Sequence, residues 1–219
     1  MKSSWHRHFF YRKESWKTTW KFRFGIVVVA AVLFFSTRNF LALQIANSLV
    51  CQEQLPPSDA LLLENFDPDY LVFERARQLE HAGIAPRAFV PTNADEEGGP
   101  PNNVAAGTVE LMARISRLDS FEILPIRIEE PISLHAANQI RDVLVRNHIN
   151  SVIVVAPGFR SRRSALIYNT VLSKAGIRVG CAPVWGVTTP KNWTHTWHGI
   201  QNVIEHFGKL QYYRIWVLR

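Results

Sequence analysis

Short apolar runs alternate with longer amphipathic segments along most of the chain. Five short runs are rich in aliphatic and β-branched residues, as strands buried on both faces are. They lie at 60–63, 87–90, 121–128, 152–155 and 177–182. Five longer segments have apolar residues at helical spacing. They lie at 67–81, 104–116, 133–147, 160–175 and 194–210. This alternation predicts an α/β fold: a Rossmann-like parallel sheet of about five strands with helices on both faces.

A longer apolar segment precedes this region. The run 24–37 has fourteen residues without a charge, and apolar character resumes after Arg38 and Asn39. Because a membrane span needs about 20 residues, we expect one transmembrane helix over 24–44, with Arg38 reaching the headgroups. A cleavable signal peptide is the alternative, but the long basic region before the run and the lack of a clear A-x-A site favour an anchor.

These elements divide the chain into five expected parts. They are a basic cytoplasmic tail at 1–23, the transmembrane helix at 24–44, a linker at 45–58, the α/β domain at 59–210 and an aromatic, basic tail at 211–219. Aromatic rings and arginines suit a membrane interface, so the last tail is expected either to contact lipid or to pack on the domain.

Charge is concentrated at the N-terminus. Residues 1–23 hold seven of the 25 Lys and Arg and one of the 18 Asp and Glu, so they carry +6 of the net +7. The domain therefore lacks a basic face, and we expect no nucleic-acid partner. By the positive-inside rule, the N-terminus is cytoplasmic and the domain lies outside the cytoplasmic (inner) membrane. A disulfide is allowed there, but Cys181 lies in a predicted core strand, so we interpret it as a buried thiol and leave its pairing with Cys51 open.

In parallel α/β sheets the site lies at the carboxyl ends of the strands. The residues at these positions are Glu64, Asn65, Asn93, Glu130, Gly158, Arg160 and Arg163. Each of them is also compatible with a solvated loop. Arg160 and Arg163 open a helix, whose N–H groups and dipole favour anions, so we expect an anion site there. The alternative is structural: Arg163 holds a carboxylate such as Glu130, and Arg160 is solvated.

Several segments resemble the YdcF-like family of envelope proteins, which includes SanA and ElyC. The matching segments are SDALLL at 58–63, FERARQLEHAGIAPRAFV at 73–90, the whole unit 151–184, and the terminal KNWTHTWHGIQNVIEHFGKLQYY at 191–213. The resemblance implies a Rossmann-like sheet behind a single membrane helix. It also implies a role that concerns the polysaccharide of the envelope or cell wall.

The polar motifs of that family are only partly kept. Arg75 and Arg163 match the family pattern. The family's glycines, serine, threonines, glutamate and histidine correspond here to Glu64, Asn65, Phe66, Pro91, Thr92, Asn93, His135, Ala137, Ala156, Pro157 and Arg160. Missing glycines obstruct close approach of a ligand to the backbone, and arginine cannot replace a general base near neutral pH.

Two functions follow from these observations. The first is a non-catalytic envelope protein that binds a membrane-protein partner, or an anionic glycan, phosphate or lipid headgroup. The second is an enzyme of envelope polysaccharide or lipid-linked sugar metabolism that uses Glu64, Glu130 or His135. The loss of the motifs favours the first. We assign no cofactor, and His195 and His198 lack the accompanying ligands of a metal site.

Overall fold

The structure is a computed structural model that describes residues 18–66, 69–94, 99–127 and 129–218. The chain divides into a unit ending at Leu41 and a compact unit from Ala42 onward. Helix α2 (Trp20–Asn47) is long and apolar enough to cross a membrane, with a mean hydropathy of 2.1 over its most apolar window. The predicted span at 24–44 lies within it.

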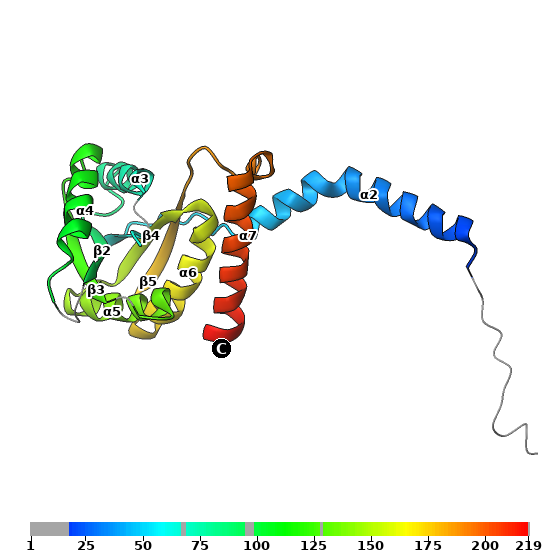
Figure 1. Cartoon of the computed structure of the whole chain (residues 1–219). Helices are drawn as coiled ribbons and strands as arrows, with labels where there is room; N and C mark the ends of the chain where they lie inside the picture. The colour runs from blue at the N-terminus through cyan, green and yellow to red at the C-terminus, as the bar shows by residue number, and fades with distance from the viewer. Residues whose placement is uncertain (1–17, 67–68, 95–98, 128, 219) are drawn as a thin grey trace, which may run out of the picture. The chain divides into compact units, whose positions relative to one another are not determined.

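Five parallel strands form one sheet in the order β3-β2-β1-β4-β5 (Figure 1). They are β1 (Ala60–Leu63), β2 (Ala88–Ala94), β3 (Phe121–Arg127), β4 (Ser151–Pro157) and β5 (Arg178–Val184). The central strands β1 and β4 are almost wholly buried, because helices cover both faces of the sheet. The predicted Rossmann-like α/β fold is confirmed.

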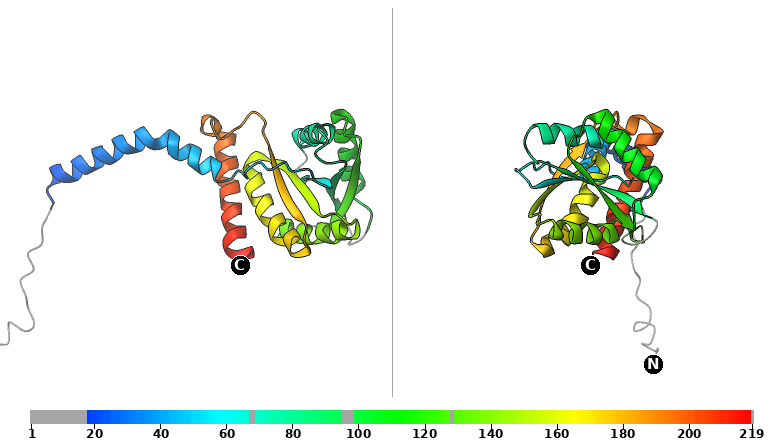
Figure 2. Two further views of the ribbon diagram at one scale, coloured as in Figure 1. Left: turned by 180° about the vertical axis from the view of Figure 1, so that it is seen from behind. Right: turned by 90° about the vertical axis from the view of Figure 1, so that its left-hand side faces the viewer.

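The helices of the compact unit are α3 (Tyr70–His81), α4 (Asn103–Ser116), α5 (Ile132–Arg146), α6 (Gly158–Leu172) and α7 (Trp197–Tyr212). Short turns of helix are η1 (Ser173–Ala175), η2 (Trp193–His195) and the π-helix η3 (Tyr213–Val217). Helices α3 and α4 pack on one face of the sheet, and α5 and α6 pack on the other (Figures 1 and 2). Helix α7 packs against α6.

Three helix starts differ from the expected ones. Helix α3 is capped by Asp69, whose side chain accepts from the N–H of Leu71, while residues 67 and 68 lie outside the described part. Ser133 lies inside α5 and does not cap it, because Pro131 occupies the cap position. Helix α6 begins at Gly158 directly after β4, so the expected loop is absent.

The segment expected as a linker at 45–58 is part of the compact unit. Ala46 and Leu49 are fully buried in a cluster with Val203 and Leu210 of α7. Such burial anchors the segment to the domain through the hydrophobic effect.

Cys51 and Cys181 form a disulfide. The interpretation of Cys181 as a buried thiol was therefore wrong. Gln54 also pairs with Cys181 in an antiparallel bridge, through backbone hydrogen bonds of 2.9 and 3.2 Å. The segment after α2 is thus fixed covalently to the edge strand β5.

The aromatic tail is helical over 211–217. Tyr213 is buried, and its hydroxyl accepts a hydrogen bond of 3.2 Å from the N–H of Ser133. Trp216 is 78% exposed. Tyr213 therefore packs on the domain, whereas the Trp216 side chain is exposed. Arg219 lies outside the described residues.

Candidate functional site

The candidate site lies where the sheet reverses its winding, between β1 and β4. From β1 the chain proceeds towards β2 and β3, and from β4 it proceeds towards β5. In open α/β sheets ligands bind at the carboxyl ends of such a pair of strands. Glu64 follows β1 directly and Gly158 follows β4, so the topology brings these two sequence-predicted positions to the same edge.

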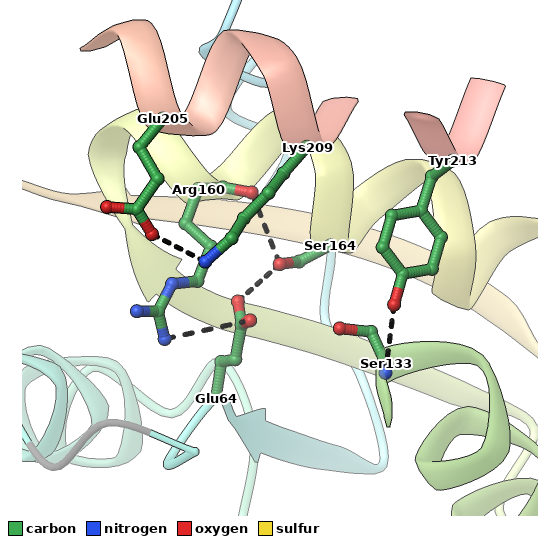
Figure 3. Close-up of polar contacts among 7 residues, drawn as sticks. All are labelled: Glu64, Ser133, Arg160, Ser164, Glu205, Lys209 and Tyr213. Atoms are coloured by element: carbon green, nitrogen blue, oxygen red, sulfur yellow. Dashed lines mark hydrogen bonds and ion pairs between the residues drawn. The ribbon is translucent and has the colours of Figure 1, made fainter. Parts of the chain in front are cut away.

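Two side chains of α6 interact with the carboxylate of Glu64. Its side chain extends towards α6 and accepts a hydrogen bond from the hydroxyl of Ser164, as Figure 3 shows. One Nη of Arg160 lies 4.0 Å from the other carboxylate oxygen. Only 3% of the Glu64 side chain and 12% of the Arg160 side chain are exposed. Buried charges need partners of opposite sign, and Glu64 and Arg160 form such a pair.

Arg163 adds a second buried cation to this group. Its guanidinium lies over the ring of Tyr213, 5.8 Å from the centroid. Burial lowers the pKa of Arg163, whereas attraction to Glu64 raises it; the guanidinium stays charged at any ordinary pH. The buried hydroxyl of Tyr168 has no hydrogen-bond partner in the described part of the chain, and burial raises the pKa of Tyr168. We call these residues, Glu64, Arg160, Arg163, Ser164 and Tyr168, the Glu64 cluster.

A cleft of about 450 Å³ borders the Glu64 cluster. It is lined by Asp69, Tyr70 and Leu71 of the α3 start, by Pro157, Gly158, Phe159 and Arg160, by Val184, Trp185, Gly186, Val187 and Thr188 after β5, and by Asn202 and His206 of α7. Among the residues of the cluster, Arg160 is the one that lines the cleft. It therefore connects the buried charges with the open space.

Trp185 forms one wall of the cleft. Its ring meets Phe159 edge to face, with 5.3 Å between the centroids. A Cβ atom on Gly158 would lie 2.2 Å from the Trp185 ring, a separation far below van der Waals contact. Glycine at position 158 thus permits the indole to pack across the start of α6.

His206 lines the cleft beside Arg160. Burial, together with the positive charges of Arg160 and Arg163, lowers the pKa of His206 to about 4. The imidazole is therefore neutral at neutral pH. On the same helix, the hydrogen bond from Lys209 lowers the pKa of Glu205, and this ion pair lies above Arg160 in Figure 3.

The other predicted site residues lie away from the cleft. Asn65 is buried, with its amide 3.4 Å from the carbonyl oxygen of Pro91. Asn93 and Glu130 are exposed. His135 lies 3.8 Å from Glu129 and is 45% exposed.

Attraction to Glu64 raises the pKa of Arg163, so Glu64 is a carboxylate that acts on this arginine. Glu130, the example given for the structural alternative, is exposed. Among the described residues no group of three or more His, Cys, Asp or Glu side chains could hold a metal ion.

Sequence reasoning missed Ser164, Tyr168, Trp185 and His206. Ser164 could have been found, because it follows Arg160 by four residues and therefore shares its side of the helix. Trp185 and His206 had no such signal, since their positions depend on how the chain folds after β5.

Comparison with known proteins adds little to this geometry. No protein-family model matches the chain, and no curated protein matches it. A solved structure, the Crystal structure of Aureusimine biosynthetic cluster reductase domain, has a TM-score of 0.26 and 12% identity over 55% of this chain. The chain spans 39% of the length of that structure. A similarity at this level says nothing about function, and the resemblance to the YdcF-like family stays a prediction from sequence.

Proposed function

We propose that the protein is a single-pass envelope protein whose YdcF-like domain binds an anionic group in the cleft without catalysing a reaction. The ligand is the phosphate or carboxylate of a glycan or of a lipid headgroup. The observation that carries this proposal is the position of Arg160, which lines the cleft on the first turn of α6. Arginine suits such ligands because its planar fork donates two parallel hydrogen bonds.

The start of α6 supports the same ligand class. Its cap residue, Pro157, makes no side-chain hydrogen bond to the helix, and Gly158 and Phe159 line the cleft with Arg160. The first N–H groups of a helix have no partner within it and carry a partial positive charge. An anion in the cleft would meet these N–H groups and the guanidinium together.

The rest of the cleft suits a sugar or another polar ring. Thr188 and Asn202 offer hydrogen-bonding groups, and the Trp185 ring offers an apolar face. The volume of about 450 Å³ is within the range of small-molecule sites, so one sugar phosphate or one headgroup is a reasonable occupant.

Two observations support an extracytoplasmic domain on the inner membrane. Residues 1–23 carry a net charge of +6 before α2, and such charge stays on the cytoplasmic side. The disulfide between Cys51 and Cys181 is expected in an oxidising compartment. Together they favour a cytoplasmic N-terminus with the domain outside.

The enzyme alternative needs acid and base groups in one pocket. Glu64 is buried and held by Ser164 and Arg160, and it does not line the cleft. Glu130 and His135 lie at the start of α5 and do not line the cleft. We therefore favour binding over catalysis.

Thermal unfolding of the detergent-solubilised full chain tests the proposal. Inorganic phosphate, glucose 1-phosphate and glucuronate should each be compared with chloride at equal ionic strength. We expect at least one anion to raise the melting temperature, because a ligand that binds only the folded state stabilises it. Arg160→Gln should remove this rise, measured against the variant's own anion-free melting temperature, which should itself be lower because the buried Glu64 loses an ion-pair partner.

Two further variants separate the roles of the arginines. Arg163→Ala should lower the melting temperature without any ligand, since it leaves Glu64 with one cation fewer. Arg146→Gln is the control, because Arg146 is exposed on α5 and does not line the cleft. An unmutated chain that responds to none of the anions, or a response that Arg160→Gln leaves intact, contradicts the proposal.

A further inference from the structure

Helix α7 has apolar side chains on two opposite sides. Val203 and Leu210 are buried against the domain. On the other side lie Trp197, Ile204 and Phe207, which are 72%, 65% and 41% exposed.

The exposed set continues beyond the helix. Ile215, 45% exposed, follows in η3. Spacings of seven, three and eight residues place these four on one side of a helix. We call Trp197, Ile204, Phe207 and Ile215 the outer stripe. A surface helix of a water-soluble domain would normally be polar at these positions.

The start of α7 lies next to the end of the predicted membrane span. The indole N–H of Trp193, in η2, donates a hydrogen bond of 3.1 Å to the carbonyl oxygen of Ala42. Ala42 is at the end of the apolar segment expected over 24–44. Trp197 opens α7 four residues after Trp193.

A groove with two arginines borders the C-terminal end of α7. This cavity of about 530 Å³ is lined by Arg162 of α6 and Arg214 of η3, both exposed, and by Asn47 and Ser48 just after the span. Leu210 also lines it, so the groove adjoins α7. Two guanidinium groups in one groove match the phosphate of a lipid headgroup in charge and hydrogen-bonding geometry.

We propose that the outer stripe of α7 docks on the bilayer that holds α2, and that Arg162 and Arg214 bind the phosphate of an anionic lipid there. Aromatic and aliphatic side chains with flanking cations are the composition of helices that lie in a membrane interface. The proposal rests on the membrane anchoring in the proposed function, and it is independent of the cleft. A lipid surface is favoured over a second copy of the chain because Trp193, just before α7, contacts the end of the expected span, and because two arginines border the same helix.

Lipid-quenched fluorescence of the full chain in nanodiscs tests this docking. The chain has two cysteines and both are in the disulfide, so one introduced cysteine is the sole thiol available for a bimane label. The label is placed at Ile204→Cys in discs that contain headgroup-level nitroxide lipid. Leu111→Cys, 53% exposed on α4, is the matched control, and Val29→Cys within α2, in discs with acyl-chain nitroxide lipid, reports on the span. We expect the labels at Ile204 and Val29 to lose fluorescence and the label at Leu111 to keep it.

Lipid composition tests the arginine groove. Quenching at Ile204→Cys should be greater in phosphatidylcholine discs that contain phosphatidylglycerol than in phosphatidylcholine alone. Arg162→Gln with Arg214→Gln should remove this difference, whereas Arg160→Gln, in the cleft, should not.

Three outcomes would overturn the proposal, and each identifies a different part of it as wrong. If Ile204 is quenched no more than Leu111 while Val29 is quenched, the docking is wrong and the anchoring stands. Cross-linking of two chains through Ile204→Cys, without quenching, would identify a second copy as the occupant. An unquenched label at Val29 overturns both the anchor and the docking.

Discussion

Breaking the disulfide should destabilise the domain strongly. Cys51 and Cys181 are separated by 130 positions in the sequence, so the bond closes a long loop of the unfolded chain. In the chain-entropy description, a loop of this length corresponds to about 5 kcal/mol of stability at 25 °C. The perturbation is the double variant Cys51→Ala, Cys181→Ala, or reduction of the unmutated protein.

Local contacts reduce the expected loss. The backbone of Gln54 still pairs with residue 181, and the N–H of Cys51 still donates to the hydroxyl of Ser161 at 3.0 Å. These bonds keep the segment in place in the folded state whether or not the sulfurs are joined. The effect therefore comes mainly from the unfolded state, and we expect a loss of roughly 3–5 kcal/mol.

Urea unfolding of the full chain in detergent, followed by tryptophan fluorescence, measures this loss. With a urea dependence of about 2 kcal/mol per molar, the midpoint should fall by about 2 M. Reductant should shift the unmutated protein as far as the double variant and should leave the double variant unchanged. A midpoint shift equivalent to less than about 1 kcal/mol would refute the loop-entropy reasoning.

Three further variants test the site. Glu64→Gln removes the carboxylate that acts on Arg163 and should cost about 3 kcal/mol in the free energy of unfolding by urea, as broken buried pairs do. Gly158→Ala should cost about 2 kcal/mol in the same assay, because its Cβ overlaps the Trp185 ring. His206 has a folded pKa of about 4 against an ordinary 6.5, so the unfolded chain binds its proton first and stability falls as the pH is lowered from 6.5 to 4; His206→Gln should flatten this slope in urea midpoints measured against pH.

Each of these variants has a control. Glu205→Gln breaks the exposed pair with Lys209 and should change stability by less than about 1 kcal/mol. Gly107→Ala adds a methyl group where no atom lies within 4 Å, so it should not destabilise. Equal losses for Glu64→Gln and Glu205→Gln, or for the two glycine variants, would contradict the assigned contacts. If the urea midpoints of the unmutated protein and of His206→Gln depend on pH in the same way, the lowered pKa assigned to His206 is contradicted.

Sequence patterns predicted the fold because apolar spacing depends on local geometry. Buried strands such as 152–155 and amphipathic helices such as 160–175 keep their periodicity whatever lies around them. The rule that sites lie at strand ends also placed Glu64 and Arg160 at one edge. Local geometry even explains the missing loop before α6: Pro157 has φ −55° and ψ 138°, which suits both the last residue of a strand and the cap of a helix.

Contacts between distant segments could not be predicted in this way. The pairing of Cys51 with Cys181 depends on how a segment before β1 meets the last strand. The wall that Trp185 forms and the position of His206 depend on the connection after β5, where no periodic pattern restricts the chain. The rule that sites lie at strand ends also selects residues that are simply solvated: Glu130 follows the third strand and is exposed.

The burial of Ala46 and Leu49 has a consequence for how the protein is made. These residues leave the ribosome about 150 residues before Val203 and Leu210, which complete their cluster. That cluster can therefore close only after the segment up to Leu210 has been translated. Cys51 cannot form its disulfide before Cys181 has been made, so the bond that fixes the segment after α2 also forms late.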